Sequence, residues 1–148
     1  MTNFGHLKKL DPTSRKEWYE FPTDPPLGRL HVCHAGRTNK PYTKALMARN
    51  AKTGLNRRLA RGKIDATVLD ENEAADRELF PKFIITGWEG VKDQDGNEVP
   101  YSHENCREFI AQLPAWLMQD LSNFCGTASN FIDDDQPDEL ETSEAAGN

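Results

Sequence analysis

The sequence predicts a mostly α-helical domain with a small N-terminal β-hairpin, an α+β fold, followed by a disordered acidic tail. Through much of residues 42–125 apolar side chains recur at helical spacings of three and four. Strand-like alternation is confined to residues 17–34. Residues 132–148 carry seven acids and no Lys or Arg. We therefore expect a polar arm (1–16), one compact helical domain that includes the β element (17–131), and the disordered tail.

Length and composition limit the class of protein. The chain has 148 residues, of which 36% are hydrophobic, and its mean hydropathy is −0.76, so one small core is expected. No apolar run approaches the ~20 residues of a membrane span, and the first residues lack a signal-peptide pattern. The three cysteines form no C-x-x-C pair, which fits packing roles in a reducing cytoplasm.

The β element comes first along the chain. Residues 17–21 are rich in aromatic side chains and suit a short strand. The proline-rich residues 22–26 break this strand, and residues 27–34 then alternate. In the second strand one face holds Leu30, Val32 and His34, and the opposite face holds His31 and Cys33. A two-stranded hairpin is marginally stable alone, so helices must cover it.

Cap residues and apolar side chains at helical spacing predict the next two helical segments. Asn39 is a good N-cap and Pro41 fits the first turn of a helix that Gly54 interrupts and Gly62 ends. Another helix starts near Asp65, and its apolar side chains are Val68, Leu69, Ala75, Leu79, Phe83 and Ile84. Pro81 should kink or split this helix, and Gly87-Trp88-Glu89-Gly90 should close it.

A tight turn and two further helices complete the domain. Asp95-Gly96 between two valines is a strong turn signal. Ser102 is a suitable N-cap for a helix that carries Cys106, Phe109, Ile110 and Leu113. Pro114 opens the last helix, whose predicted apolar side comprises Trp116, Leu117, Leu121, Phe124 and Cys125.

Metal binding has weak support in the sequence. His31 and Cys33 with His103 and Cys106 form a Cys₂His₂ set of the type that binds zinc, but the two halves are far apart in the chain. Residues 93–98 are acidic, yet Gly96 is fourth in the loop, where a calcium-binding EF-hand needs glycine at the sixth position. We expect no bound metal or other cofactor, with a plain turn at 93–98.

Catalysis has no recognisable motif here. The sequence contains no G-x-S-x-G, P-loop or dinucleotide fingerprint. None of the four histidines stands beside a nucleophile in an activating pattern. We therefore expect a protein that is not an enzyme.

Charge is strongly segregated. The net charge is −6, yet no acid lies between Asp24 and Asp65, where ten Lys and Arg residues occur. This basic run, which includes Arg49, Arg57, Arg58 and Arg61, fits a surface for nucleic acid, a contact with an acidic protein or the chain's own tail, or a plain solvated face. Nucleic acid is the less expected partner, because the acidic tail would compete and no RNA-binding aromatic signature accompanies the run.

Several short motifs in residues 84–131 resemble a known family. Ile84–Val91 contains an apolar-Gly-Trp-Glu motif, which is followed by Asp95-Gly96 and then by Pro100-Tyr101-Ser102 and Glu104-Asn105. Asn130-Phe131 stands just before the charged tail. In this pattern the chain resembles the tail assembly chaperones of long-tailed bacteriophages. The sequence departs from the family pattern at Pro81 and at His103, where the family often has proline.

The resemblance implies a mostly helical cytoplasmic protein of the infected host cell. Such a protein would bind the helix-rich tape measure protein, keep it soluble and help to recruit tail tube subunits. An apolar groove lined by Trp88, Phe109 and Trp116, with charge around it for reversibility, would suit this role. The further partner-binding candidates are Arg49, Arg57, Arg58 and Arg61 of the basic run. Self-association stays open, and no membrane is involved. The alternatives are a permanent structural protein of the virion, in the tail or connector, and a small nucleic-acid-binding or zinc-stabilised regulator.

Overall fold

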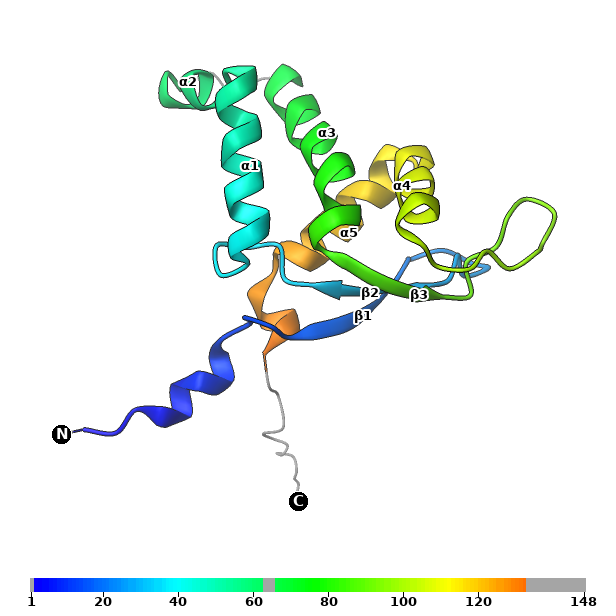
Figure 1. Ribbon diagram of the computed structural model, residues 1–148, viewed down its shortest axis with the longest axis horizontal. Helices are drawn as coiled ribbons and strands as arrows, with labels where there is room; N and C mark the ends of the chain where they lie inside the picture. The colour runs from blue at the N-terminus through cyan, green and yellow to red at the C-terminus, as the bar shows by residue number, and fades with distance from the viewer. Residues whose placement is uncertain (1, 63–65, 133–148) are drawn as a thin grey trace.

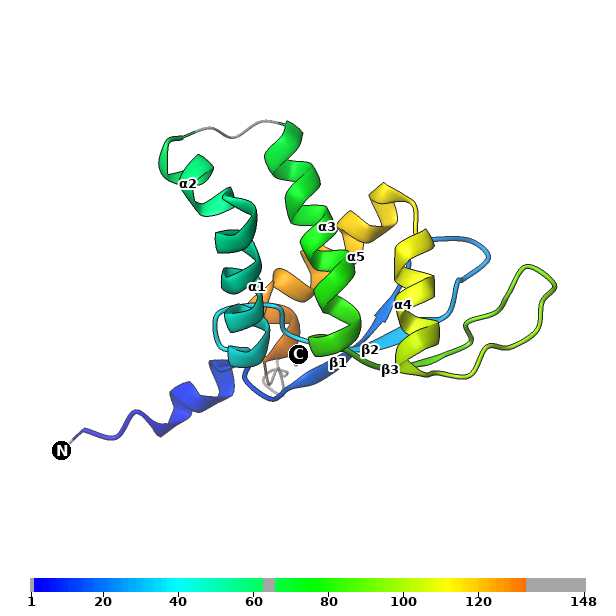
Figure 2. The same cartoon turned by 45° about the horizontal axis from the view of Figure 1, so that its top comes forward.

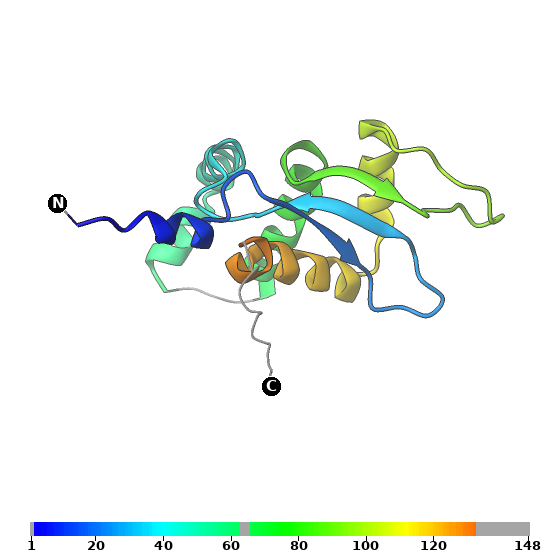
Figure 3. The same ribbon diagram turned by 90° about the horizontal axis from the view of Figure 1, so that it is seen from below.

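Three antiparallel strands and a set of helices form one layer each (Figure 1). The computed structural model describes residues 2–62 and 66–132. In Figure 1, α1, α3 and α4 stand on one side of the sheet, and Figure 3 shows the sheet from its other side. The mostly helical α+β fold predicted from the sequence is confirmed. The predicted disorder of the acidic tail concerns residues beyond Ile132, which lie outside the described residues.

The sheet contains one strand more than the predicted hairpin. Strands β1 (Lys16–Glu20) and β2 (Arg29–Cys33) pair as expected, and β3 (Ile85–Glu89) pairs with β2 on its other side. In register, Tyr19 faces Leu30, which faces Trp88. The predicted alternation in β2 is confirmed, because Leu30 and Val32 are fully buried while the intervening residues are half-buried.

The segment around Gly87-Trp88 was wrongly predicted as the closing turn of a helix. Helix α3 (Ala66–Phe83) ends earlier, and the chain continues directly into β3. Ile84, Ile85 and Thr86 are β-branched and favour an extended backbone. Moreover, the free edge of β2 offers hydrogen-bond partners, and Ile84 O accepts from Cys33 N at 2.9 Å.

Helices α1 (Lys40–Thr53) and α2 (Leu55–Ala60) follow the sequence prediction closely. The Asn39 side chain accepts a hydrogen bond from Tyr42 N at 3.3 Å, so it caps α1. Gly54 separates the two helices and has a φ of 78°, a left-handed conformation that favours glycine.

Pro81 was predicted to kink or split the helix, and the structure excludes the split, because α3 runs unbroken through Pro81. It lies in the last turn of the helix, and Ile84 N still donates to Phe80 O at 2.9 Å beyond it. A proline this close to the helix end removes a single bond from the helix ladder. The buried positions of Phe80 and Pro81 in the core hold this turn in place.

The C-terminal helices cover the core, and their caps agree with the sequence. In α4 (His103–Gln112) the Ser102 side chain accepts from Asn105 N at 3.0 Å. Helix α5 (Ala115–Gly126) buries Leu117, Met118, Leu121 and Cys125. Trp116 was wrongly placed on this apolar side, because 59% of the side chain is exposed. The short 3₁₀ helix η2 (Ala128–Phe131) then buries Phe131 completely.

One continuous core fills the space between the sheet and the helices. Its largest fully buried side chains are Phe80, Phe131, Leu30, Ile84, Ile110, Met118 and Leu121. Leu55 on α2 is also fully buried but lies outside this cluster. The three cysteines are free thiols. Burial raises the pKa of the Cys106 thiol to about 12 and also raises that of Cys125, so both stay protonated and act as small packing residues.

The first residues form an arm that leaves this body. A 3₁₀ helix, η1 (Gly5–Leu10), buries none of its residues. Figures 1 and 2 show it extending away from the helices and the sheet.

Candidate partner-binding groove

A groove lies where β3, the 91–99 loop and α4 meet. Its floor is aromatic, since the Trp88 and Phe109 rings lie edge to face with centroids 5.5 Å apart. Tyr101 makes a similar contact with Trp88 at 5.3 Å, and Phe21 with Phe109 at 5.9 Å. These contacts continue into the core, so the groove floor is part of the folded structure.

Two hydrogen bonds fix the orientation of this floor. Trp88 Nε1 donates to Val99 O at 2.9 Å, and the Tyr101 hydroxyl donates to Ile85 O at 3.0 Å. The first bond joins β3 to the last residue of the loop, and the second joins β3 to the segment that follows the loop. The indole polar group is therefore satisfied internally, and the groove presents a preformed apolar surface.

The loop on one side of the groove owes its shape to Asp93. Its Oδ1 accepts from Asp95 N at 2.9 Å and from Asn97 N at 3.0 Å, and Lys92 forms a β-bridge with Glu98. This is a side-chain-stabilised reversal, as the sequence predicted for residues 93–98.

Polar side chains surround the apolar floor. The groove is lined by Trp88, Val91, Lys92, Asp93, Gln94, Val99, Asn105, Glu108, Phe109, Gln112, Leu113 and Pro114. A second hollow adjoins it and shares Lys92, Asp93 and Phe109, and its other lining residues are Pro25, Pro26, Leu27, Gly28, Gly90 and Glu98. We call the two hollows together the Phe109 groove.

Residues 25–28 were not predicted as part of a site. In the sequence they read only as the break between two strands. They reach the groove because the β1–β2 turn packs against the residue after β3: the Gly28 position lies close to Glu89 O and Gly90 C. A contact between segments about sixty residues apart leaves no local signal in the sequence.

The structure separates the predicted partner-binding residues into groups. Trp88 and Phe109 lie together on the groove floor. Trp116 is exposed on α5 and does not line the groove. The arginines belong to α1, α2 and the residue after α2, and Figures 1 and 2 show α2 at the far side of α1 and α3 from α4.

The predicted arginines differ in how they are engaged. Arg49 forms ion pairs with Glu78 at 3.0 Å and Glu71 at 3.5 Å on α3, so it joins two helices. Arg58 is half-buried, and its Nε and Nη2 atoms are buried without a hydrogen-bond partner. Arg57 and Arg61 are exposed.

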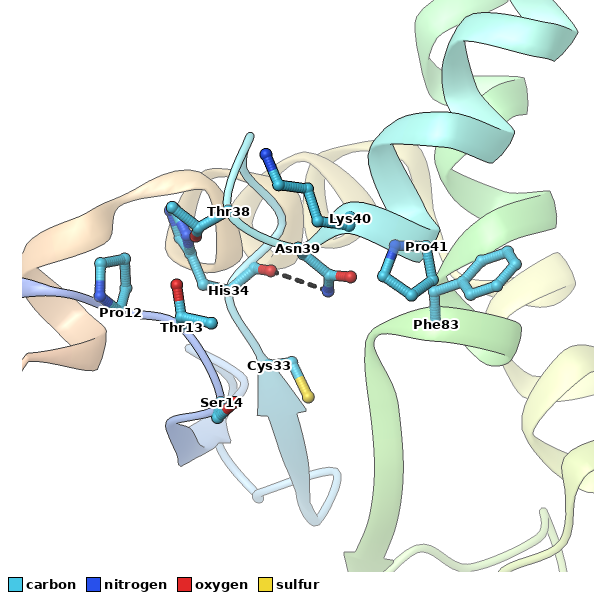
Figure 4. A pocket seen from close by; sticks show the side chains of 10 residues that line it. All are labelled: Pro12, Thr13, Ser14, Cys33, His34, Thr38, Asn39, Lys40, Pro41 and Phe83. Carbon is cyan, nitrogen blue, oxygen red and sulfur yellow. Dashed lines mark hydrogen bonds between the residues drawn. The ribbon is translucent and has the colours of Figure 1, made fainter.

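A separate hollow, outside the Phe109 groove, lies at the base of the arm (Figure 4). Cys33 and His34 both line it, yet their side chains point in different directions, as neighbours on an extended chain do (Figure 4). Burial raises the pKa of the Cys33 thiol, which disfavours the reactive thiolate. The His34 carbonyl accepts from Asn39 Nδ2 at 3.1 Å, so this hollow is tied to the α1 cap.

The four zinc candidates do not converge. His31 stacks on Trp18 with ring centroids 4.6 Å apart, whereas Cys106 is fully buried in α4. Across residues 2–62 and 66–132, no group of three or more His, Cys, Asp or Glu side chains could hold a metal ion. Within the same residues, no helix is both long and apolar enough to cross a membrane.

The uncovered side of the sheet carries an aromatic and charged cluster. The Arg29 guanidinium lies 4.2 Å from the Trp18 ring centroid and donates to Glu89 Oε1 at 2.8 and 3.0 Å. Trp18 is 37% exposed. Since the cation and the indole face are engaged with neighbours, this cluster serves chiefly to tie the three strands together.

Fold and groove together define a small α+β protein with a preformed, aromatic-floored groove on its surface. A family model, described as YdaY prophage protein, matches residues 37–148. The chain therefore belongs to this family of prophage proteins, and it is a phage-derived protein. The comparison with curated proteins gives no match, and neither does the comparison with solved structures.

Proposed function

We propose that this prophage protein is a tail assembly chaperone. In this proposal it works in the host cytoplasm without catalysing a reaction, binds the tape measure protein and helps to recruit tail tube subunits. Membership of a prophage protein family supports the phage setting. The motifs of residues 84–131 support the tail assembly role by resemblance.

The Phe109 groove is the observation that carries the proposal. A tape measure protein exposes long amphipathic helices before the tail tube encloses them, and such helices aggregate unless their apolar faces are covered. A groove with an apolar floor and a polar rim suits one face of such a helix. The fixed Trp88 and Phe109 rings lower the entropic cost of binding because they are ordered beforehand.

The rim gives the interaction its reversibility. Lys92, Asp93 and Glu108 are exposed beside the floor. Charged groups at a rim speed association and fix orientation more than they add affinity. A chaperone must release its client to the growing tube, so a modest affinity is an advantage.

Co-expression with the tape measure protein of the same prophage tests the proposal. We expect a soluble complex, and we expect Phe109→Ala to weaken it by about tenfold or more, as loss of a central aromatic contact does. Leu69→Ala is the matched control, since Leu69 is 63% exposed on α3 and does not line the groove. Thermal unfolding of both variants separates lost binding from lost folding.

Two results would contradict the proposal. One is a tape measure protein that stays insoluble and unbound when this chain is present. The other is detection of this chain in stoichiometric amount in purified mature particles, which would identify a structural virion protein instead.

A further inference from the structure

The N-terminal arm carries an apolar stripe that nothing in the described chain covers. Phe4, Leu7 and Leu10 are 61%, 50% and 55% exposed. A 3₁₀ helix has three residues per turn, so side chains at this spacing lie above one another on a single face. Leu7 and Leu10 therefore share one face of η1, which buries none of its residues, and the exposed Phe4 stands at the N-cap just before this helix.

We infer that the arm of one copy docks into the Phe109 groove of a second copy. An ordered apolar stripe on a short arm is typical of a segment that binds another surface. The groove offers the complementary shape, with an apolar floor made by Trp88, Phe109 and Leu113. Both parts are present in every copy, so no further component is needed.

Charge complementarity supports this occupant. The last turn of η1 carries Lys8 and Lys9, and all six residues of η1 lack an acid. The rim of the groove contributes Asp93 and Glu108, with Lys92 as its one opposing charge. The arm is thus a cationic apolar segment, and the rim of the groove has an acidic excess.

The arm lies too far from the Phe109 groove of its own copy to dock there (Figures 1 and 2). Figures 1 and 2 show the arm at the end of the molecule next to the start of α1, while the 91–99 loop projects from the opposite end. Figure 3 gives the same separation from another direction. A contact of arm and groove therefore joins two copies, as a two-fold dimer where the exchange is reciprocal and as a head-to-tail chain where it is not.

Self-association by this route would occupy the groove that the tail assembly role assigns to a client. The arm then acts as a placeholder that the client displaces, because both present an apolar face to the same floor. The docking itself depends on the groove alone and does not depend on the identity of the client. The two proposals can therefore fail separately.

Sedimentation of the full chain over a range of concentrations is the test. The wild type should associate with rising concentration, and Leu7→Asp should weaken association by about tenfold or more, because it places a charge in an apolar contact. Leu69→Asp is the matched control, because Leu69 is an exposed leucine (63%) outside the arm.

A charge exchange tests the direction of docking. Lys8→Glu with Lys9→Glu should weaken self-association, and mixing this protein with the Glu108→Lys variant should restore association between the two. Lys44→Glu with Lys52→Glu makes the same charge change on exposed residues of α1 and should leave association unchanged.

A wild type that stays monomeric at all concentrations would overturn the inference, as would association that Leu7→Asp leaves intact. A monomeric chain that still solubilises the tape measure protein would refute arm docking only. Self-association without any client binding would refute the tail assembly role only.

Discussion

The Tyr42 hydroxyl on α1 donates a hydrogen bond of 3.0 Å to the Asp76 carboxylate on α3. The second oxygen of Asp76 accepts from Ser122 Oγ on α5 at 2.7 Å. One carboxylate thus joins three helices that are distant in sequence. Burial raises the pKa of Asp76 above its ordinary value of 3.8, and the hydrogen bonds from Ser122 and Tyr42 oppose this rise in part.

Removal of this junction should destabilise the fold. Asp76→Ala leaves the Tyr42 and Ser122 hydroxyls without their acceptor in a partly buried position, which should lower the free energy of unfolding by about 1–3 kcal/mol. Asp70→Ala is the control, because Asp70 is an exposed acid on the same helix. Urea unfolding of both variants measures the difference, and equal losses would contradict a role for the junction.

The raised pKa of Asp76 predicts a pH dependence of stability. A carboxyl whose pKa is higher in the folded state contributes stability that is fully present below pH 3.8 and lost as pH rises through the raised folded pKa. Asp76→Asn cannot titrate, so the stability of the wild type relative to this variant should fall as pH rises from about 4 to 7. Parallel unfolding curves across that interval, with a constant difference, would refute the prediction.

Arg77 on α3 should stabilise the C-terminal end of α4. Its guanidinium donates to Ile110 O at 2.7 Å and to Leu113 O at 2.8 Å, and it pairs with Glu73. These carbonyls belong to the helix end, where backbone acceptors lack partners. Arg77→Ala should cost about 2–3 kcal/mol, and Arg77→Lys should recover only part, because lysine lacks the two-pronged donor.

An arginine on α4 itself provides the comparison for Arg77. Arg107 is exposed, and Arg107→Ala should change the free energy of unfolding by less than about 0.5 kcal/mol. Denaturant titration of the three variants gives the ranking. A Lys variant as stable as the wild type would show that the charge alone is enough.

Gly28 should not tolerate a side chain. Its φ is 101°, and a Cβ atom there would lie 2.8 Å from Glu89 O and from Gly90 C. Gly28→Ala should therefore cost about 1–3 kcal/mol and loosen the hollow beside Phe109. In Gly87→Ala the new Cβ meets nothing closer than His31 Cβ at 4.0 Å, and the loss should stay below about 1 kcal/mol. Thermal unfolding of the two variants tests the contrast, and similar melting temperatures would contradict it.

Phe131 should anchor the end of the described chain. It is fully buried and packs against His34 at 5.5 Å and Phe124 at 5.7 Å between ring centroids. Phe131→Ala should cost about 3–5 kcal/mol, whereas Met47→Ala, at a side chain 60% exposed, should cost less than about 0.5 kcal/mol. Chemical denaturation monitored by tryptophan fluorescence measures the loss. A loss below about 1 kcal/mol for Phe131→Ala would show that packing of η2 contributes little to the stability of the domain.

Local chemistry made much of this fold predictable. Asn39 and Ser102 are caps because a short polar side chain meets the free backbone N–H groups of the first turn. Gly54 divides α1 from α2 because it adopts a left-handed backbone. Each of these signals is contained within a few residues of the chain.

Non-local contacts account for what the sequence did not reveal. The third strand forms because residues 85–89 pair with the free edge of β2, and no local sequence pattern predicts that this edge is available. Trp116 has helical spacing typical of a core residue, yet Leu117, Met118 and Leu121 already fill the buried side of α5. Trp88 and Phe109 meet as expected, but the proline-rich turn beside them comes from a distant segment.

The long stretch of chain between β2 and β3, residues 34–84, affects the order in which the sheet can form during synthesis. The first two strands are synthesised early, and Leu30 and Val32 then have neither the third strand nor α3 to cover them. A lone hairpin of this kind is marginally stable. The hairpin of β1 and β2 therefore becomes stable only after residues up to Glu89 have left the exit tunnel and β3 can pair with β2.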